Sequence, residues 1–297
     1  FISITLVALC SLTASAAGAQ ESWPSKPIRM IVPFPPGGSN DVIGRQVAQQ
    51  LSKRLNQPVV IDNRGGGGGS IGANVVATSP ADGYTLMVGG IFNMVMNKAL
   101  IKNLPYDPEK DFVTLGYVSA YPFVLLARPD LPGNSLAEWV AYAKERPGKL
   151  TYGSGGIGTL QYTWGTILVG SLGLDMLHIP YKGAAPALVE VVGGQVETMF
   201  IALPQTLPHI KSGRVRALGV ANAKRAATLP EVPTITEQGV TGYEVTSHFG
   251  VLAPGSTPRD MVQRLNALMA PALQSAYVKE RYNAGGSRSE EHTSELQ

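Results

Sequence analysis

Short apolar runs alternate with helix-forming stretches along most of this chain, and this alternation restricts its fold more than any other feature. Residues Ile28–Phe34 (IRMIVPF) form a branched apolar run that is typical of a buried strand. After them, Ile43, Val47, Leu51 and Leu55 recur at the spacing of one helix face. Strands that alternate with helices pair in parallel, because the connecting helix returns the chain to the same end of the sheet. The sequence therefore predicts α/β sheets with covering helices.

The same alternation continues along the rest of the chain. Further strands are expected at Val59–Ile61, Tyr84–Val88, Phe123–Ala127, Leu150–Tyr152, Leu177–Ile179, Thr198–Ile201, Val215–Val220 and Phe249–Leu252. Further helices are expected at Ile71–Ala77, Leu136–Glu145, Thr159–Leu172, Ala185–Val192, Gln205–Lys211 and Met261–Tyr282, the last interrupted at Pro271. Two such sheets fit within 297 residues, so we expect two lobes, with Pro129–Gly133 and Gly239–Tyr243 as candidate crossings between them.

The two ends of the chain differ in character from the rest. Phe1–Ala19 carries no charge and holds an apolar run followed by small residues, which is the pattern of a cleaved secretory signal peptide. An uncleaved anchor is the alternative. Cys10 is the only cysteine of the chain, so we expect no disulfide after cleavage. Ser287–Gln297 is polar, aperiodic and similar to translated sequencing-adapter sequence, and we expect it to be a non-native tail.

Two glycine-rich loops each follow an expected strand and open an expected helix. They are Pro35–Asp41 (PPGGSND), in which Ser39 or Asn40 can cap the helix, and Gly153–Thr159 (GSGGIGT). Glycines let the backbone approach a ligand closely, and the first N–H groups of a helix are unsatisfied and favour negative charge. Such loops also serve as ordinary turns of α/β proteins. Because one lies in each expected lobe, the pair favours a site for a carboxylate or phosphate that needs no lysine or arginine.

Other chemistries lack their required spacing. The run Gly65–Gly69 lacks the lysine that a Walker loop places after its glycines. The GxGxxG spacing within Gly153–Gly158 lacks an acidic residue at the end of the following strand. His178, His209 and His248 lie far apart along the chain and form no metal-ligand pattern. The net charge of +3 is diffuse, without the basic stripe of a nucleic-acid-binding protein. The sequence thus predicts no catalysis, cofactor, metal site or nucleic-acid partner.

Several segments, taken together and in order, resemble the Bug family, the periplasmic substrate-binding components of tripartite tricarboxylate transporters. The resemblance runs from about Trp23 to about Gly286. The segments that carry it are WPSKPIRMIVPFPPGGSND (Trp23–Asp41), NRGGGGGSIGA (Asn63–Ala73), PADGYTL (Pro80–Leu86), LPYDPEKDF (Leu104–Phe112), YGSGGIGT (Tyr152–Thr159), HIPYKGAAPAL (His178–Leu188), LPEVPTITEQG (Leu229–Gly239) and GVLAPGSTP (Gly250–Pro258).

The resemblance implies a two-lobed, flytrap-like periplasmic binding protein in which each lobe is a mostly parallel sheet with flanking helices. It implies one lobe from residues 20–125 with 244–286 and a second from 126–243. Such a protein is a periplasmic monomer without enzymatic activity. It captures a small mono- or dicarboxylate, or a related polar acid, largely through backbone amides and bridging waters, and delivers it to membrane permease subunits. Presentation of the closed form to a sensor kinase is the alternative function, and a periplasmic enzyme is a weaker one.

The resemblance also implies a set of ligand-binding residues. Carried over position by position, they are Phe34, Gly37, Gly38, Ser39, Asn40 and Asp41 in the first loop, Ser154, Gly156, Gly158 and Thr159 in the second, and Ser70, Gly90 and Ile201 at strand or loop ends. A carboxylate at Asp41 repels an anion, so we expect this side chain to accept hydrogen bonds at the helix start instead. Lys182 is expected to be solvated or to lie between the lobes, with direct ligand contact as the alternative.

The chain departs from the family pattern in two places. Tyr162-Thr163 stands where the family usually has His-Leu, which we expect to alter either lobe packing or the pocket. The tail Ser287–Gln297 replaces the family's last helical segment and puts the stability of the first lobe in doubt.

Overall fold

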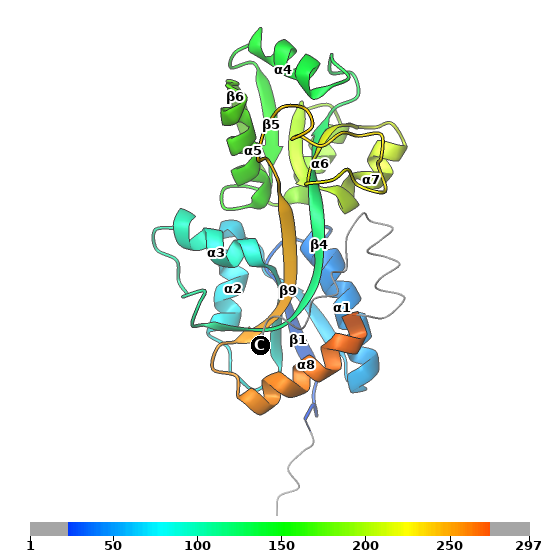
Figure 1. The fold of residues 1–297 in the computed structure, drawn as a ribbon. Coiled ribbons are helices and arrows are strands. Elements are labelled where there is room, and N and C mark those ends of the chain that lie inside the picture. The colour runs from blue at the N-terminus through cyan, green and yellow to red at the C-terminus, as the bar shows by residue number, and fades with distance from the viewer. Residues whose placement is uncertain (1–22, 274–297) are drawn as a thin grey trace, which may run out of the picture.

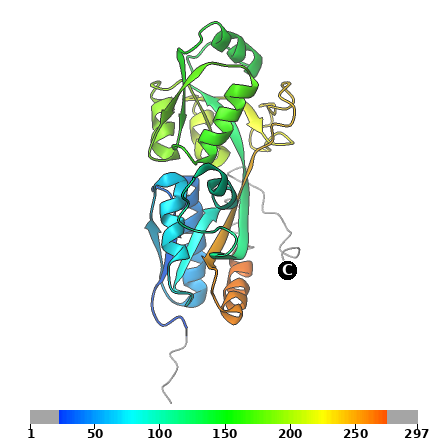
Figure 2. The same ribbon diagram turned by 90° about the vertical axis from the view of Figure 1, so that its left-hand side faces the viewer.

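A computed structural model describes residues 23–273 of the chain, without the side chains of residues 91–93, 272 and 273, as two lobes stacked end to end (Figures 1 and 2). The strands are β1 (Ile28–Val32), β2 (Val59–Asn63), β3 (Thr85–Gly90), β4 (Phe112–Ala127), β5 (Leu150–Ser154), β6 (Met176–Pro180), β7 (Thr198–Ala202), β8 (Arg216–Ala221) and β9 (Thr246–Pro254). The helices are α1 (Ser39–Leu55), α2 (Ser70–Ala77), α3 (Ile91–Leu100), α4 (Leu136–Lys144), α5 (Leu160–Ser171), α6 (Ala184–Val192), α7 (Leu203–Lys211) and α8 (Arg259–Leu273), with a 3₁₀ turn at Gly67–Gly69.

The two sheets are mixed and share the long strand β4. In the first lobe the strand order is β2-β1-β3-β9-β4, and β1 pairs in parallel with both β2 and β3. In the second lobe β5 pairs in parallel with β6 and β7, while β4 lies between β7 and β8 and is antiparallel to both. The expected parallel pairing is therefore confirmed for β1 with β2 and β3 and for β5 with β6 and β7, whereas β4 and β9 are antiparallel to their neighbours.

The chain passes from the first lobe to the second within β4, and it returns at the start of β9. Residues 112–122 of β4 pair with β9, and the pairing then changes to β7 and β8 from Phe123 onward. Pro122 stands at this change, where its missing N–H ends one ladder without leaving an unpaired donor. The crossings expected at Pro129–Gly133 and Gly239–Tyr243 are thus wrong, since the first segment follows the end of β4 and the second precedes the start of β9. The predicted division into residues 20–125 with 244–286 and 126–243 stays a prediction.

The sequence located most elements but missed two and misplaced a cap. Helix α3 and residues 112–122 of β4 were not expected, and no break occurs at Pro271, which lies inside α8. Gly38, not Ser39 or Asn40, is the N-cap residue of α1, and it makes no side-chain capping bond because glycine has no side chain. The predicted signal peptide and non-native tail lie outside the described residues. Among the residues described, no helix is both long and apolar enough to cross a bilayer.

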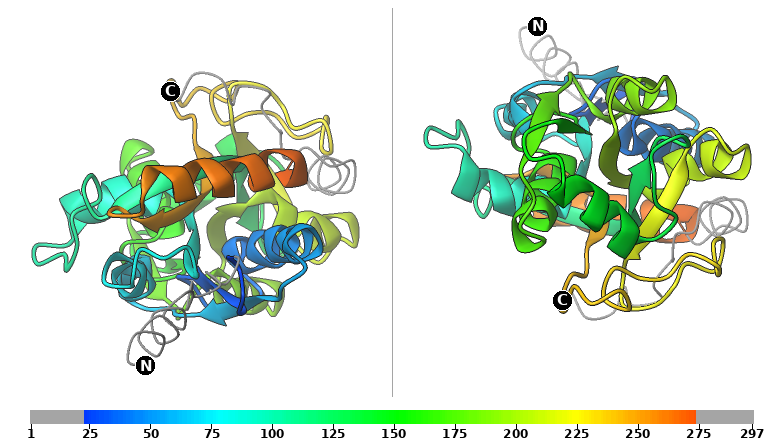
Figure 3. Two further views of the ribbon diagram at one scale, coloured as in Figure 1. Left: turned by 90° about the horizontal axis from the view of Figure 1, so that it is seen from below. Right: turned by 90° about the horizontal axis from the view of Figure 1, so that it is seen from above.

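Helices cover both faces of each sheet, so consecutive strand residues are buried in different cores. In β1, Met30 belongs to the large core beneath α1, and Ile31 belongs to the smaller core beneath α2 and α3. In β4, Phe123 and Val124 divide in the same way between two clusters. Seen from below, α8 lies across the first lobe beside α1 (Figure 3). This packing fixes the start of α1, and with it the first glycine loop.

Leu51 is fully buried on the inner face of α1, whereas Gln49 is exposed on the same helix. We expect Leu51→Ala to lower the free energy of unfolding by about 2–5 kcal/mol, because it removes buried methyl groups and leaves a cavity. Gln49→Ala should change it by no more than about 0.5 kcal/mol. Urea unfolding followed by circular dichroism measures both. Equal effects of the two substitutions would contradict the described packing of α1.

Candidate ligand-binding site

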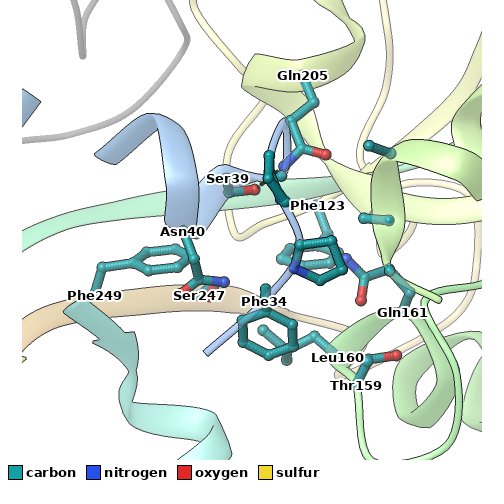
Figure 4. A pocket seen from close by; sticks show the side chains of 16 residues that line it. Phe34, Ser39, Asn40, Phe123, Thr159, Leu160, Gln161, Gln205, Ser247 and Phe249 are labelled. Carbon is teal, nitrogen blue, oxygen red and sulfur yellow. Dashed lines mark hydrogen bonds between the residues drawn. The ribbon is translucent and has the colours of Figure 1, made fainter. Parts of the chain in front are cut away.

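A pocket lies between the two lobes where their loops meet β4 and β9 (Figure 4). Its volume is about 550 Å³, which includes the part open to solvent. It is lined by Phe34, Pro35, Pro36, Gly38, Ser39 and Asn40 from the first lobe, by Phe123, Ser247 and Phe249 from β4 and β9, and by Thr159, Leu160, Gln161, Gly183, Ala184, Ala185 and Gln205 from the second lobe. None of these residues carries a charge. The pocket thus suits a small molecule held by neutral groups.

Several helices begin at this pocket. Helices α1, α5 and α6 start with Ser39, Leu160 and Ala184, which all line it, and Gln205 stands in the first turn of α7. Within the described part of the chain, the N–H groups of Ser39, Asn40, Leu160 and Ala184 have no protein acceptor. Unsatisfied N–H groups and helix dipoles give the pocket a positive potential without any cationic side chain. The arrangement can hold an anion that is dehydrated by lobe closure.

Asp41 holds the first loop in shape through hydrogen bonds made outside the pocket. Its carboxylate accepts hydrogen bonds from the Gly37 N–H, Arg45 Nε and Asn63 Nδ2, each at 3.0 Å. Burial by itself raises the pKa of this carboxyl, but the hydrogen bonds from Arg45, Gly37 and Asn63 outweigh burial and hold the pKa below its usual value. Asp41 is not among the residues that line the pocket. Its contacts agree with the expected role as an acceptor at the helix start.

Ser154 and Thr159 hold the second loop. The Ser154 hydroxyl oxygen accepts a hydrogen bond from the Gly156 N–H at 3.0 Å and lies 2.7 Å from Nε2 of His178. The Ser154 hydroxyl group therefore links the Gly156 backbone to the His178 imidazole. Thr159 caps α5 by accepting from the Tyr162 N–H at 3.3 Å, and its hydroxyl donates to the Gly156 carbonyl at 2.6 Å. The loop is thus held by side chains on both of its ends.

Tyr162, one of the departures from the family pattern, lies beneath the second loop. Its ring centroid is 4.8 Å from that of His178, and the Tyr152 ring lies 5.0 Å from the same imidazole. Burial lowers the pKa of His178. The neighbouring Thr163 is buried and donates to the Thr159 carbonyl at 3.2 Å. Both residues therefore pack among those that support the loop, and neither lines the pocket.

The loops of the two lobes touch each other in this structure. Gly68 of the first lobe packs so closely on Gly158 of the second that a Cβ atom at residue 68 would lie 2.8 Å from the Gly158 carbonyl oxygen. Gln205 Nε2 donates a hydrogen bond to Ser39 Oγ across the same junction. A Cβ atom at Gly183 would lie 3.1 Å from the ring of Pro35. The structure is therefore in a closed arrangement, and no ion pair contributes to these contacts.

The structure brings part of the predicted site together. Phe34, Gly38, Ser39, Asn40 and Thr159 line the pocket. Gly37, Asp41, Ser154, Gly156 and Gly158 belong to the two loops but support or join them instead of lining the pocket. Three residues lie elsewhere: Ser70 is buried at the start of α2, Gly90 pairs with Phe249 at the end of β3, and the fully buried Ile201 belongs to the apolar core of the second lobe. The direct ligand contacts assigned to all these residues stay predictions.

Sequence reasoning missed the pocket residues on β4 and β9 and those on α6 and α7. Phe123, Ser247 and Phe249 are brought there by long-range strand pairing, which local spacing does not reveal. A signal did exist for Ala184 and Ala185, because Gly183 follows an expected strand and opens an expected helix like the two recognised loops. Lys182 is exposed and does not line the pocket. Among the described residues no three His, Cys, Asp or Glu side chains gather as a metal site would need.

His178 makes the fold sensitive to mild acid. A depressed pKa means that stability is complete above the unfolded pKa of about 6.5 and is lost as the pH falls through the folded value. We expect the unfolding free energy to decrease from about pH 7.5 to about pH 5, and to decrease less in His178→Gln, whose side chain does not titrate. Urea unfolding at both pH values measures this difference. Identical losses in the two proteins would show that His178 is not held neutral by the fold.

Comparison with known proteins places the chain in a family. Residues 43–291 match the family described as tripartite tricarboxylate transporter family receptor. The structure of the periplasmic binding protein BugD is similar, with a TM-score of 0.86 and 36% identity, over 90% of this chain and 89% of that one. MatC (Rpa3494) from Rhodopseudomonas palustris, solved with bound malate, gives a TM-score of 0.85 and 33% identity over 89% of this chain and 90% of that one.

A second R. palustris protein, Rpa4515 solved with adipate, gives a TM-score of 0.86 and 36% identity, over 90% of this chain and 89% of that one. These similarities extend over both lobes, and the proteins concerned share the two-lobed fold of periplasmic binding proteins. The family and its fold are those of binding proteins. The chain belongs to the Bug family of solute-binding receptors of tripartite tricarboxylate transporters.

Proposed function

We propose that this protein binds a small mono- or dicarboxylate, or a related polar acid, in the periplasm and delivers it to the membrane permease subunits of a tripartite transporter. The observation that carries the proposal is the meeting of two helix starts, one from each lobe, at a single uncharged pocket. There the unpaired N–H groups of Ser39 and Asn40 are opposed by those of Leu160 and Gln161. An anion between them gains hydrogen bonds from both lobes at once.

The lining favours an organic acid over inorganic anions and cations. Three phenyl rings, those of Phe34, Phe123 and Phe249, present apolar faces that suit a carbon skeleton (Figure 4). A cation would meet the positive ends of the helix dipoles without a carboxylate to offset them. The malate and adipate found in two relatives are both small dicarboxylates with a carbon skeleton between the charged ends.

Delivery requires that the ligand favour the closed form. The contacts between the lobes are neutral ones, such as the Gly68–Gly158 approach and the Ser39–Gln205 hydrogen bond, so they contribute modestly to closure. A ligand that bridges both loops adds the differential affinity that shifts the population. A permease can then recognise the closed form. No observation favours the alternative partner, a sensor kinase, and a pull-down with each detergent-solubilised membrane protein separates the two.

We expect the purified mature protein to bind at least one small carboxylate from a panel that includes malate, succinate and adipate. At 100 times its dissociation constant, such a ligand should stabilise the fold by about 2.7 kcal/mol. For a protein of this size each kcal/mol raises the melting temperature by about 2–4 °C. Differential scanning fluorimetry measures the shift, with the corresponding neutral amides as controls. Equal shifts with the amides, or none with any acid, would contradict the proposal.

The tight approach of Gly68 to Gly158 makes closure sensitive to a single methyl group. We expect Gly68→Ala to weaken carboxylate binding at least tenfold, because its Cβ atom would meet the Gly158 backbone. Gly173→Ala is the matched control, since φ is +63° at Gly68 and +64° at Gly173, but no atom lies within 4 Å of a Cβ at residue 173. Both variants bear similar backbone strain. Calorimetric titration should separate them, and equal affinities would argue against closure at this contact.

A further inference from the structure

Three side-chain oxygens in the pocket have no protein hydrogen-bond partner. They are Oγ of Ser247, Oδ1 of Asn40 and Oε1 of Gln205, and each is shielded from solvent. Ser247 is fully buried on β9, whereas Asn40 and Gln205 come from the first turns of α1 and α7. A buried polar group without a partner is destabilising, because it has lost its hydrogen bonds to water. Three such oxygens in one pocket indicate that a ligand completes their hydrogen bonds.

The oxygens lie apart from the start of α5. In Figure 4, Asn40 and Ser247 lie on the left of the pocket beside Phe249, and Thr159 and Gln161 lie on the right. Gln205 enters from the second lobe and already donates from Nε2 to Ser39. A ligand whose carboxylate is held at the helix starts therefore places its other polar group among these oxygens.

The chemistry of the three groups restricts what that polar group is. An ammonium group would need a carboxylate, and none of the residues that line the pocket is charged. An ionised carboxylate only accepts hydrogen bonds, so it would leave the two amide oxygens unpaired. A purely alkyl chain would leave all three oxygens unpaired. A hydroxyl group both donates and accepts, so it satisfies an amide oxygen and the Ser247 hydroxyl together. It also remains suitable if either amide is rotated so that its NH₂ group faces the ligand.

We propose that the ligand is a small hydroxy acid, whose hydroxyl group is recognised by Ser247, Asn40 and Gln205. This inference rests on the proposed carboxylate-binding function and adds a specificity to it. A site built to hydrogen-bond a hydroxyl group rejects the analogue that lacks it, because its own buried polar groups are then left unpaired. Ser247 is the central residue, since it is the most deeply buried of the three and can both donate to and accept from the ligand.

The test compares matched pairs that differ only in the hydroxyl group: lactate with propionate, 3-hydroxybutyrate with butyrate, and malate with succinate. Calorimetric titration of the mature protein should find at least one pair in which the hydroxy acid binds at least tenfold more tightly. A ratio below tenfold in every pair that binds would overturn the inference and leave the carboxylate-binding function standing. If no acid of the panel binds, the carboxylate-binding function itself fails, and this inference fails with it.

Two variants assign the selectivity to its residues. Ser247→Ala should reduce the ratio of affinities within the selective pair at least fivefold. Asn40→Ala, at a half-buried position that tolerates truncation more easily, should reduce it in the same direction. Ser119→Ala is the control, because Ser119 is an equally buried serine of β4 that does not line the pocket. A ratio unchanged by both Ser247→Ala and Asn40→Ala would overturn the assignment, as would an equal reduction by Ser119→Ala.

Discussion

The antiparallel pairing of β4 with β9 is the constraint on which the rest of this structure depends. The two strands pair from Phe112–Pro254 to Pro122–Thr246, and β4 then continues into the second sheet. A single hydrophobic cluster continues from Met30 in the first lobe to Phe200 in the second, and the β4–β9 ladder within it sets the relation between the glycine loops. The same strands supply Phe123, Ser247 and Phe249 to the pocket. The strands that connect the lobes therefore also line the pocket.

The positive potential of the site comes from backbone geometry, and side chains serve to hold that geometry. Side-chain hydrogen bonds hold both loops. Asp41 and Asn63 make them in the first loop, and Ser154, Thr159 and His178 make them in the second. Backbone N–H groups cannot change rotamer, so a site made from them is preorganised and loses little entropy when an anion binds. Asp41, Ser154 and His178 accordingly support the loops through their side chains without lining the pocket.

The sequence predicted the local features of this protein and missed those that depend on long-range pairing. The loops at Gly38 and Gly158 were recognisable because a strand, glycines and a helix start follow one another directly. Ser247 carries no such signal, and it reaches the pocket only because β9 pairs with Tyr121 of β4. The first part of β4 was missed because Gly116 and Pro122 interrupt its apolar pattern, and the crossing points were misplaced for the same reason. Expected ligand contact at Ile201 followed from its position at a strand end, where the core of the second lobe buries it.

The neutral lining also bears on release, which a carrier needs as much as capture. A buried ion pair between a ligand carboxylate and an arginine would keep much of its attraction when one lobe swings away. In this pocket the donors are divided between α1 on one lobe and α5 and α6 on the other, and each set is weak alone. Separation of the lobes removes one set and admits water to the other, so the affinity falls in a single movement. An anion site without cations is thus suited to a protein that must give its ligand up on opening.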